Sequence, residues 1–117
     1  AEIFQTEGYK EIEMLKLARN TFYSVKVSYC NNLYNLCEKE NIDYSLFRKH
    51  FARAEWVGQQ HTYVPGPDEK FGYGGKCLPK DSTELLNFSK NNGIIFDMLE
   101  KSIQFNKSQR KKETKNA

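Results

Sequence analysis

The stretch from Tyr9 to Glu40 decides the fold, and it reads YKEIEMLKLARNTFYSVKVSYCNNLYNLCEKE, without a proline or a glycine. Apolar residues recur in it at spacings of three and four, the period of one face of an α-helix. We call this set the apolar stripe; it comprises Leu15, Ala18, Phe22, Val25, Tyr29, Leu33 and Leu36. The pattern predicts one helix from about residue 9 to residue 40.

A helix this long exceeds what one small core can cover. About thirty residues span about 45 Å at the rise of an α-helix, whereas a chain of 117 residues makes one small domain. Part of the apolar stripe should therefore pack against a second copy of the chain. We predict a homodimer formed through this helix.

The three cysteines of the chain, Cys30, Cys37 and Cys77, cannot all pair, and none belongs to a Cys-x-x-Cys set. This usage favours a reducing, cytoplasmic compartment. Cys30 and Cys37 lie two helical turns apart on the long helix, so we assign them to a packed face rather than to a metal site.

Shorter elements follow the long helix. Asn41-Ile42-Asp43 breaks the pattern, and Asp43 or Ser45 can cap a second helix that continues to about Ala54. Its buried side is predicted to consist of Leu46, Phe47, His50 and Phe51. The next segment, Glu55 to Lys80, contains most of the glycines and all three prolines. It reads as one long loop, and loops of that length in small domains are usually functional.

Two more helices are predicted after the loop. Asp81-Ser82-Thr83-Glu84 has the spacing of a capping box and opens a third helix that stops at Asn91-Asn92-Gly93. Phe96, Leu99 and Ile103 mark a fourth helix that ends near Asn106. We therefore predict an all-α domain over residues 1–108, with one long helix, three shorter helices and one long Gly/Pro-rich active-site loop.

Composition limits the classes of partner. Mean hydropathy is −0.77 and 28% of the residues are charged, and no apolar run approaches the roughly twenty residues of a membrane span. The net charge of +3 comes largely from a basic, disordered tail predicted at 109–117. Such a tail could touch nucleic acid, but no aromatic platform or recognition motif accompanies it. We expect a solvated end and no nucleic-acid partner.

The run FGYGGKCLPKD, from Phe71 to Asp81, concentrates the candidate chemistry. Its three glycines allow backbone N–H groups to approach a ligand closely. Cys77, just ahead of a helix N-terminus and near Lys76 and Lys80, should favour its nucleophilic thiolate. Asp81 follows one turn later and could act as a general base. The alternative is that Cys77 is a small buried apolar residue and Asp81 only an N-cap.

This run resembles the catalytic-cysteine signature of the UDP-glucose/GDP-mannose dehydrogenase family. A second match, EMLKLARNTF from Glu13 to Phe22 followed by Asn31, resembles the start of that family's central helical domain. The lead-in VPGPD, from Val64 to Asp68, is similar to one branch of the family. The resemblance runs from about Glu11 to Asn106.

The resemblance implies a chemistry for the matching residues. Family members oxidise a nucleotide-sugar alcohol to a carboxylate in two NAD-dependent steps, and Cys77 would carry the thiohemiacetal and the thioester between them. Lys16 and Asn20 would hold the oxyanion, and Asp81 would position the hydrolytic water. UDP-glucose is the implied substrate, with GDP-mannose and UDP-N-acetylhexosamines as alternatives. The residues implied to bind the sugar and its diphosphate are Phe71, Gly72, Tyr73, Gly74 and Lys80.

Other parts of the family pattern are not found in this sequence. Its one glycine cluster does not follow an apolar strand, as a dinucleotide fingerprint would. We therefore expect the Rossmann NAD domain and the C-terminal nucleotide-sugar domain to be absent, so that activity would need a separate NAD-binding domain or chain. A non-catalytic helical dimerisation module derived from this family is the alternative.

One departure concerns the substrate. Trp56-Val57-Gly58 stands where many relatives have an Arg-Ile-Gly that reaches across the dimer, and tryptophan cannot supply a bidentate charge. Arg53, one turn earlier, is the alternative cation. His61 resembles a residue of the VPGPD branch, and we assign it a structural role.

Overall fold

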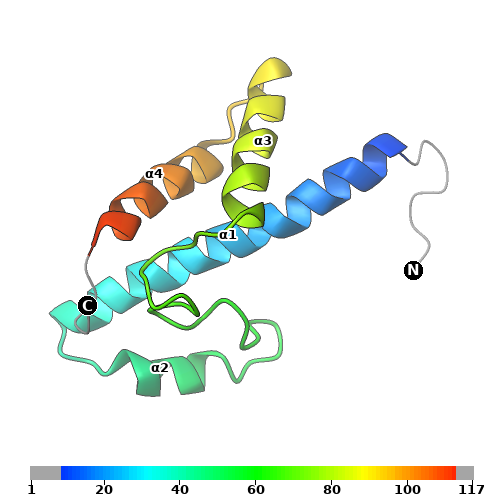
Figure 1. Cartoon of the computed structure of the whole chain (residues 1–117). Coiled ribbons are helices and arrows are strands. Elements are labelled where there is room, and N and C mark those ends of the chain that lie inside the picture. Colours follow the sequence, from blue (N-terminus) through cyan, green and yellow to red (C-terminus); the bar gives the residue numbers. More distant parts are fainter. Residues whose placement is uncertain (1–8, 113–117) are drawn as a thin grey trace.

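A computed structural model describes residues 9–112 of the chain. Within that range it contains α1 (Tyr9–Lys39), α2 (Tyr44–Phe51), α3 (Cys77–Asn91) and α4 (Asp97–Lys111), shown in Figure 1. The described residues contain no strand, so the predicted all-α fold is confirmed. The long first helix ends within one residue of its predicted end.

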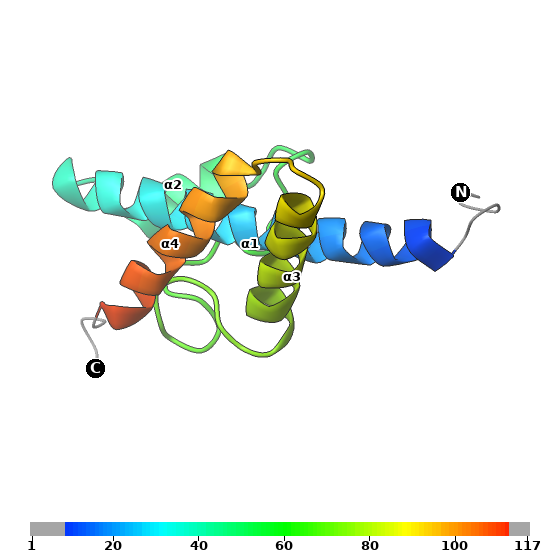
Figure 2. The same ribbon diagram turned by 90° about the horizontal axis from the view of Figure 1, so that it is seen from above.

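α1 is the axis on which the other elements are placed. α3 and α4 pack on it and on each other, while α2 runs back along its C-terminal half (Figure 1). Figure 2 shows from above that α3 and α4 cross the same side of α1. The connection between α2 and α3, residues 52–76, is the predicted long loop, and it returns the chain to the middle of α1.

The apolar core lies where α1, α3 and α4 meet. Leu99 is fully buried there with Leu17, Leu85 and Leu86, and Val25 and Ile103 pack against this cluster. Most of the remaining inner face of α1, which we define as Thr21, Ser24, Ser28 and Asn31, is buried and polar. Two hydroxyl pairs join the helices: Ser82 donates to Ser24 at 2.7 Å, and Ser102 donates to Ser28 at 2.8 Å.

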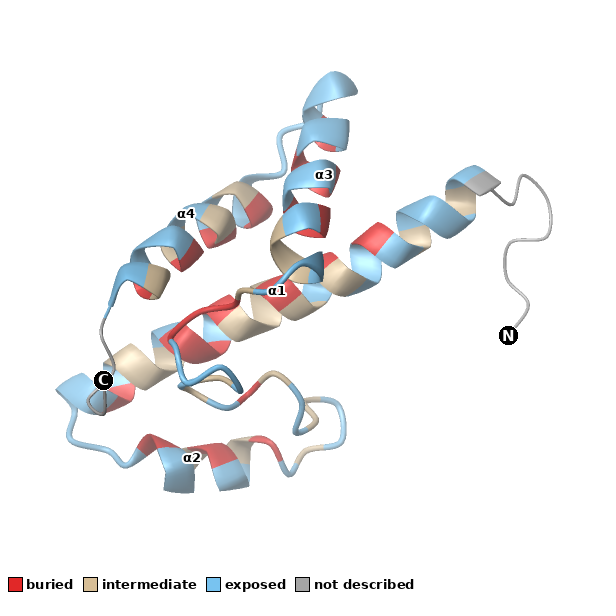
Figure 3. Cartoon of the chain, in the orientation of Figure 1, coloured by how far each residue is buried: buried red, intermediate tan, exposed pale blue. Residues whose placement is uncertain are grey.

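Most residues of the apolar stripe do not pack inside the chain. Its members Phe22, Tyr29 and Leu36, which we call the outer face, are 65%, 56% and 59% exposed. Figure 3 shows the contrast along α1, with buried positions turned towards α3 and α4. Periodicity locates an apolar face but does not say whether its partner is in the same chain.

The predicted buried side of α2 is wrong. Leu46 and His50 are exposed, and Phe47 and Phe51 are half-buried, whereas the buried residues of this helix are Tyr44 and Arg48. These two donate to the following loop: the Tyr44 hydroxyl bonds the Thr62 carbonyl at 2.6 Å, and Arg48 bonds the Gln59 side chain at 2.9 Å. Buried loop oxygens need such donors, which is why a tyrosine and an arginine turn inward.

Asp43 caps α2 as predicted, but the helix ends at Phe51.

The predicted start of α3 is also wrong. The helix begins at Cys77 rather than at Asp81, and Lys76 at its N-cap makes no side-chain capping bond. Pro79 lies in the first turn, where no backbone N–H is needed, so the helix can start four residues earlier. Asp81 therefore lies inside the helix and is not its cap. Its end at Asn91, followed by Gly93 with φ +71°, is as predicted.

α4 continues past the predicted end near Asn106 to Lys111. Residues 109–111, assigned by sequence to the basic tail, are therefore helical, and Gln109 is buried. The rest of that tail, 113–117, lies outside the described residues, as do residues 1–8.

Cys30 and Cys37 are buried and free, as predicted for a packed face. No helix in the described range is long and apolar enough to cross a bilayer.

Candidate functional site

Cys77 occupies the first position of α3 and is exposed. Sequence analysis placed Cys77 ahead of a helix that opens at Asp81, whereas the structure places it inside the helix, in its first turn. The Leu78 carbonyl accepts a hydrogen bond from Ser24 at 3.4 Å, which ties this turn to α1. The alternative in which Cys77 is a buried apolar residue is excluded by its exposure.

Asp81 lies one turn after Cys77 on the same side of α3, because residues four apart share a helix face. It is buried at 3% exposure. Asn20 on α1 donates its amide N–H to the Asp81 carboxylate at 2.6 Å. Two residues assigned to one site are thus in contact, although they are far apart in the sequence.

Lys16 lies one turn before Asn20 on α1, on the same side of the helix. It is exposed and makes no hydrogen bond or ion pair with residues 9–112. Lys76 and Lys80, on either side of Cys77, are exposed as well. The structure therefore leaves three ammonium groups free in the first turn of α3 and the neighbouring part of α1.

Both aromatic residues predicted to bind substrate point into the protein. Phe71 and Tyr73 are 3% and 5% exposed. Phe71 packs on the ring of Tyr34 with centroids 5.3 Å apart. Burial raises the pKa of Tyr73, and hydrogen bonds with Ser82 and Ser24 offset part of this shift. In this chain the two rings anchor the loop, and only Gly74 and Gly75 at its end approach the surface.

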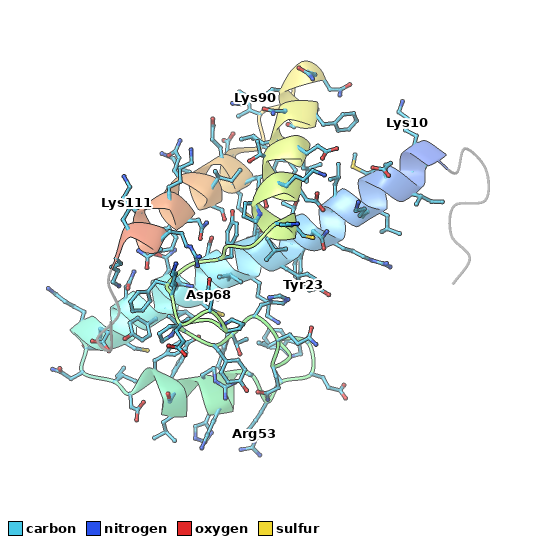
Figure 4. All side chains as sticks on the ribbon, viewed as in Figure 1. Lys10, Tyr23, Arg53, Asp68, Lys90 and Lys111 are labelled. Carbon is cyan, nitrogen blue, oxygen red and sulfur yellow. The ribbon has the colours of Figure 1, made fainter. Side chains whose placement is uncertain are left out.

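A cavity of about 550 Å³ adjoins this loop. Its walls include the backbone from Gly72 to Gly75 and the side chains of His61, Tyr63 and Leu78. Cys77 does not line the cavity, but its neighbours Gly75 and Leu78 do. Figure 4 shows Asp68, another lining residue, and Tyr23 near this part of the molecule.

His61 forms part of the cavity wall. Its ring stacks on Tyr23 with centroids 4.4 Å apart, and its φ is +65°, an uncommon conformation for a residue other than glycine. Burial, and then the nearby charge of Lys26, lowers the pKa of His61. His61 thus contributes a stacked ring to the cavity wall.

Trp56, which stands at the position of the family arginine, and Arg53, the alternative cation, are both exposed. Trp56 is 87% exposed, and Figure 4 shows Arg53 projecting from the surface beyond α2. Neither side chain makes a hydrogen bond within residues 9–112. Neither residue lines the cavity beside the glycine loop.

The described residues do not fit a dinucleotide. They include no strand and hence no βαβ unit, on which such a site depends. A Cβ on Gly72 or Gly74 would meet Asn106 or Arg110, so both glycines lie against α4 on that side. Within residues 9–112 no group of three His, Cys, Asp or Glu could hold a metal ion.

Three polar residues that hold the glycine loop were missed as site residues: Asn31, Asn106 and Arg110. Asn31 and Asn106 were noted only as points in the family match. The available signal was helical spacing, because the buried side of α4 runs Leu99, Ser102, Asn106 and Gln109. An asparagine on a buried helix face requires hydrogen-bond partners, and its partner here is the loop.

Comparison with known proteins adds an independent finding. Residues 10–108 match the family model described as "UDP-glucose/GDP-mannose dehydrogenase family, central domain". UDP-glucose 6-dehydrogenase TuaD of Bacillus subtilis is 34% identical over 98 residues, which are 84% of this chain and 20% of that protein. UDP-glucose 6-dehydrogenase YwqF of the same organism is 32% identical over 107 residues, 92% of this chain and 23% of that protein.

A third relative, a UDP-glucose 6-dehydrogenase of Rickettsia bellii, is 35% identical over 95 residues. These residues are 81% of this chain and 21% of that protein. The chain therefore spans about a fifth of the length of the curated relatives it matches. The matched segment includes both motifs on which the resemblance was based.

Proposed function

Because the chain belongs to the UDP-glucose/GDP-mannose dehydrogenase family, we propose that it supplies the nucleophilic thiol for the oxidation of a nucleotide sugar, with UDP-glucose as substrate and NAD as hydride acceptor. The observation that carries the proposal is the exposed Cys77 at the first position of α3, one turn from the Asn20–Asp81 pair. The named relatives are UDP-glucose 6-dehydrogenases.

The first step assigned to these residues is addition of the thiol to a sugar aldehyde. The Cys77 sulfur bonds to the carbonyl carbon, the C=O π bond breaks, and the thiol proton ends on the former carbonyl oxygen. Lys16 and Asn20 are the donors that stabilise negative charge on that oxygen, and such donors act more strongly on the transition state than on the aldehyde. The covalent bond keeps the aldehyde from leaving between oxidations.

The last step is hydrolysis of a thioester at Cys77. Asn20 binds one oxygen of the Asp81 carboxylate, and in the proposed step the other oxygen accepts a proton from water, which then passes to the leaving sulfur. Water oxygen bonds to the acyl carbon, the carbon–sulfur bond breaks, and the thiol is regenerated. The intervening oxidation requires residues beyond 9–112, because the described part does not fit a dinucleotide.

The test uses the purified chain and the 6-aldehyde of UDP-glucose. Iodoacetamide alkylation of each cysteine is followed by peptide mapping, with glutathione as a free-thiol reference. Cys77 should react faster than glutathione, and the aldehyde should protect it reversibly. Asn20→Ala should raise the aldehyde concentration for half-protection roughly tenfold, the loss of one oxyanion donor.

The matched control is Asn87→Ala, which removes an exposed amide from α3 without touching the site. It should leave half-protection unchanged. A Cys77 that reacts no faster than glutathione, and that the aldehyde does not protect, would refute the thiol chemistry. That result would favour the non-catalytic helical module.

We also propose that the chain forms a homodimer through α1. The support is the outer face, where Phe22, Tyr29 and Leu36 recur every seven residues and are more than half exposed. A seven-residue apolar repeat suits packing against a second helix. A second copy of α1 is the occupant, because the same repeat is available on both copies in a symmetric dimer.

A further inference from the structure

We propose that the C-terminal half of α4 positions the glycine loop, residues 71–75, and through it Cys77, with Asn106 as the principal positioning residue and Arg110 as the second. The inference rests on the proposed role of Cys77 as the nucleophile. Neither residue belongs to the catalytic set. They act on the backbone that leads into the first turn of α3.

Asn106 binds both backbone groups of one loop residue. The Tyr73 N–H donates to Asn106 Oδ1 at 2.7 Å, and Asn106 Nδ2 donates to the Tyr73 carbonyl at 3.0 Å. Asn106 is 8% exposed and Tyr73 is 5% exposed. The amide therefore replaces the neighbouring strand that would satisfy these groups in a sheet. Because the groups are buried, no other partner is at hand if the amide is removed.

Side chains hold the adjacent backbone groups as well. From α1, Asn31 Oδ1 accepts from the Gly72 N–H at 3.0 Å. From α4, Arg110 donates to the Phe71 carbonyl at 3.3 Å and to the Asp68 carboxylate at 2.9 Å. The loop is thus fixed between α1 and α4 residue by residue, although it has no regular secondary structure.

The glycines of the loop are explained by this contact with α4. Gly72 has φ +78°, and a Cβ there would collide with Asn106 Oδ1. A Cβ on Gly74 would collide with the guanidinium of Arg110. Only Gly75 among the three has open space around it, with no atom within 4 Å of a Cβ. Two glycines that sequence reasoning gave to ligand approach therefore let α4 reach the backbone.

The loop passes this constraint to Cys77 over a short path. Tyr73 is the last residue bound by Asn106, and α3 begins at Cys77. Gly74 and Gly75 lie between them, so nothing but two glycines and Lys76 separates the anchored residue from the first turn. A displaced Tyr73 would allow that turn to fray, and Cys77 would lose its fixed position one turn before Asp81.

The experiment is hydrogen–deuterium exchange of the full chain, compared for wild type, Asn106→Ala and Gln104→Ala. Asn106→Ala should speed exchange of the amides from Gly72 to Leu78 roughly tenfold, because the loop opens locally. Exchange of amides around Leu17 in α1 should stay within about twofold of wild type. Gln104→Ala removes an exposed side chain from the same helix and should change neither region.

The second readout separates this inference from the proposed function. If the UDP-glucose 6-aldehyde protects Cys77 of the wild type, Asn106→Ala should weaken that protection roughly tenfold. Equal protection and equal loop exchange in the variant would overturn the inference and leave the function standing. An unprotected wild-type Cys77 would overturn the function, while loop exchange would still decide whether α4 positions the loop.

Arg110→Gln decides the case if Asn106→Ala does not fold, because the Arg110 side chain is 25% exposed and lies at the edge of the contact. It should speed loop exchange roughly threefold. Unchanged exchange from Gly72 to Leu78 in a folded Arg110→Gln chain would overturn the positioning role of α4.

Discussion

The inner and outer faces of α1 differ in composition. In a helix of a lone domain, the inner face is expected to be apolar and the outer face polar, whereas the two faces of α1 show the reverse. Beside Leu17 and Val25, which pack in the core, the inner face presents Thr21, Ser24, Ser28 and Asn31. The outer face presents Phe22, Tyr29 and Leu36, each more than half exposed, although the centroid of the Tyr29 ring lies 6.4 Å from that of Phe51 in α2. Apolar side chains normally seek burial because of the hydrophobic effect. In the homodimer that we propose, the outer face would be covered by a second copy of α1, whereas the inner face is covered within the chain.

Small side chains explain the inner face. Serine occupies little more volume than alanine, so α3 and α4 can approach α1 closely, and paired hydroxyls satisfy each other at 2.7 and 2.8 Å. Buried polar groups cost little when they are hydrogen-bonded. The outer face has no such arrangement, and its large side chains are suited to interlocking with another helix.

The largest expected effect comes from placing charges on the outer face. Phe22→Asp combined with Tyr29→Asp should convert the dimer to a monomer, because two carboxylates would have to be buried at the interface. The dissociation constant should rise at least about 100-fold, or about 2.8 kcal/mol. Light scattering coupled to size exclusion, over a dilution series, measures it.

Arg19→Asp provides the control, since it puts a charge on an exposed position of α1 outside the outer face. It should leave the dimer intact. A wild-type chain that is monomeric at all measurable concentrations would break the comparison between the faces.

A smaller effect is expected from enlarging the inner face. Ser28→Leu should destabilise the folded chain by about 1–3 kcal/mol, because a close-packed contact cannot accept a larger side chain without strain. Urea denaturation measures the free energy of unfolding. Asn32→Leu, at an exposed position one turn later, should change it by less than about 0.5 kcal/mol. A tolerated leucine at Ser28 would mean that the inner face is loosely packed.

Some features of the fold and of the candidate site could be predicted from the sequence, and others could not. The extent of α1 was predictable because no residue between Tyr9 and Lys39 interrupts a helix. The end of α3 was predictable from Gly93. Cys77 and Asp81 were singled out from the run between Phe71 and Asp81, and Asn20 was singled out through the family resemblance. Each of these depends on local sequence or on a short motif.

What could not be predicted depends on contacts between distant segments. Three features depend on which element packs against a given residue. These are the inner face of α1, the direction of Arg48 towards the loop, and the role of Asn106. The start of α3 was misassigned because two local rules compete there. A capping-box spacing pointed to Asp81, whereas Pro79 in the first turn allowed the helix to begin at Cys77.

A third side of α1, facing α2, gives a pH-dependent prediction. Burial raises the pKa of the Cys30 thiol, although the Tyr44 hydrogen bond and nearby cations offset part of the shift. The unfolded thiol ionises near pH 8.5, while the folded chain keeps its proton to higher pH. The stability from this difference is complete below about pH 8.5 and is lost as the pH rises through the folded value.

Urea denaturation between pH 7 and pH 10 checks this expectation. The free energy of unfolding should fall above about pH 8.5, by at most about 1.4 kcal/mol per pH unit for one group. Cys30→Ala should be less stable at pH 7, through lost packing, but its decline with pH should be shallower. Equal slopes for the two chains would show that Cys30 is not the group responsible.

The smallest effect tests whether the inner face depends on its hydroxyl pairs or only on small size. Ser24→Ala removes the oxygen that accepts from Ser82, so it should cost about 1 kcal/mol through the loss of a buried hydrogen bond, although Ser82 keeps its contact with the Tyr73 hydroxyl. Replacing Ser82 as well removes that donor, and the double variant should be more stable than the sum of the single changes predicts. Ser108→Ala, at an exposed site on α4, serves as the control.

Strict additivity in this cycle of urea denaturations would mean that the hydroxyls do not stabilise each other. In that case small size alone, which alanine also provides, would account for the polar inner face.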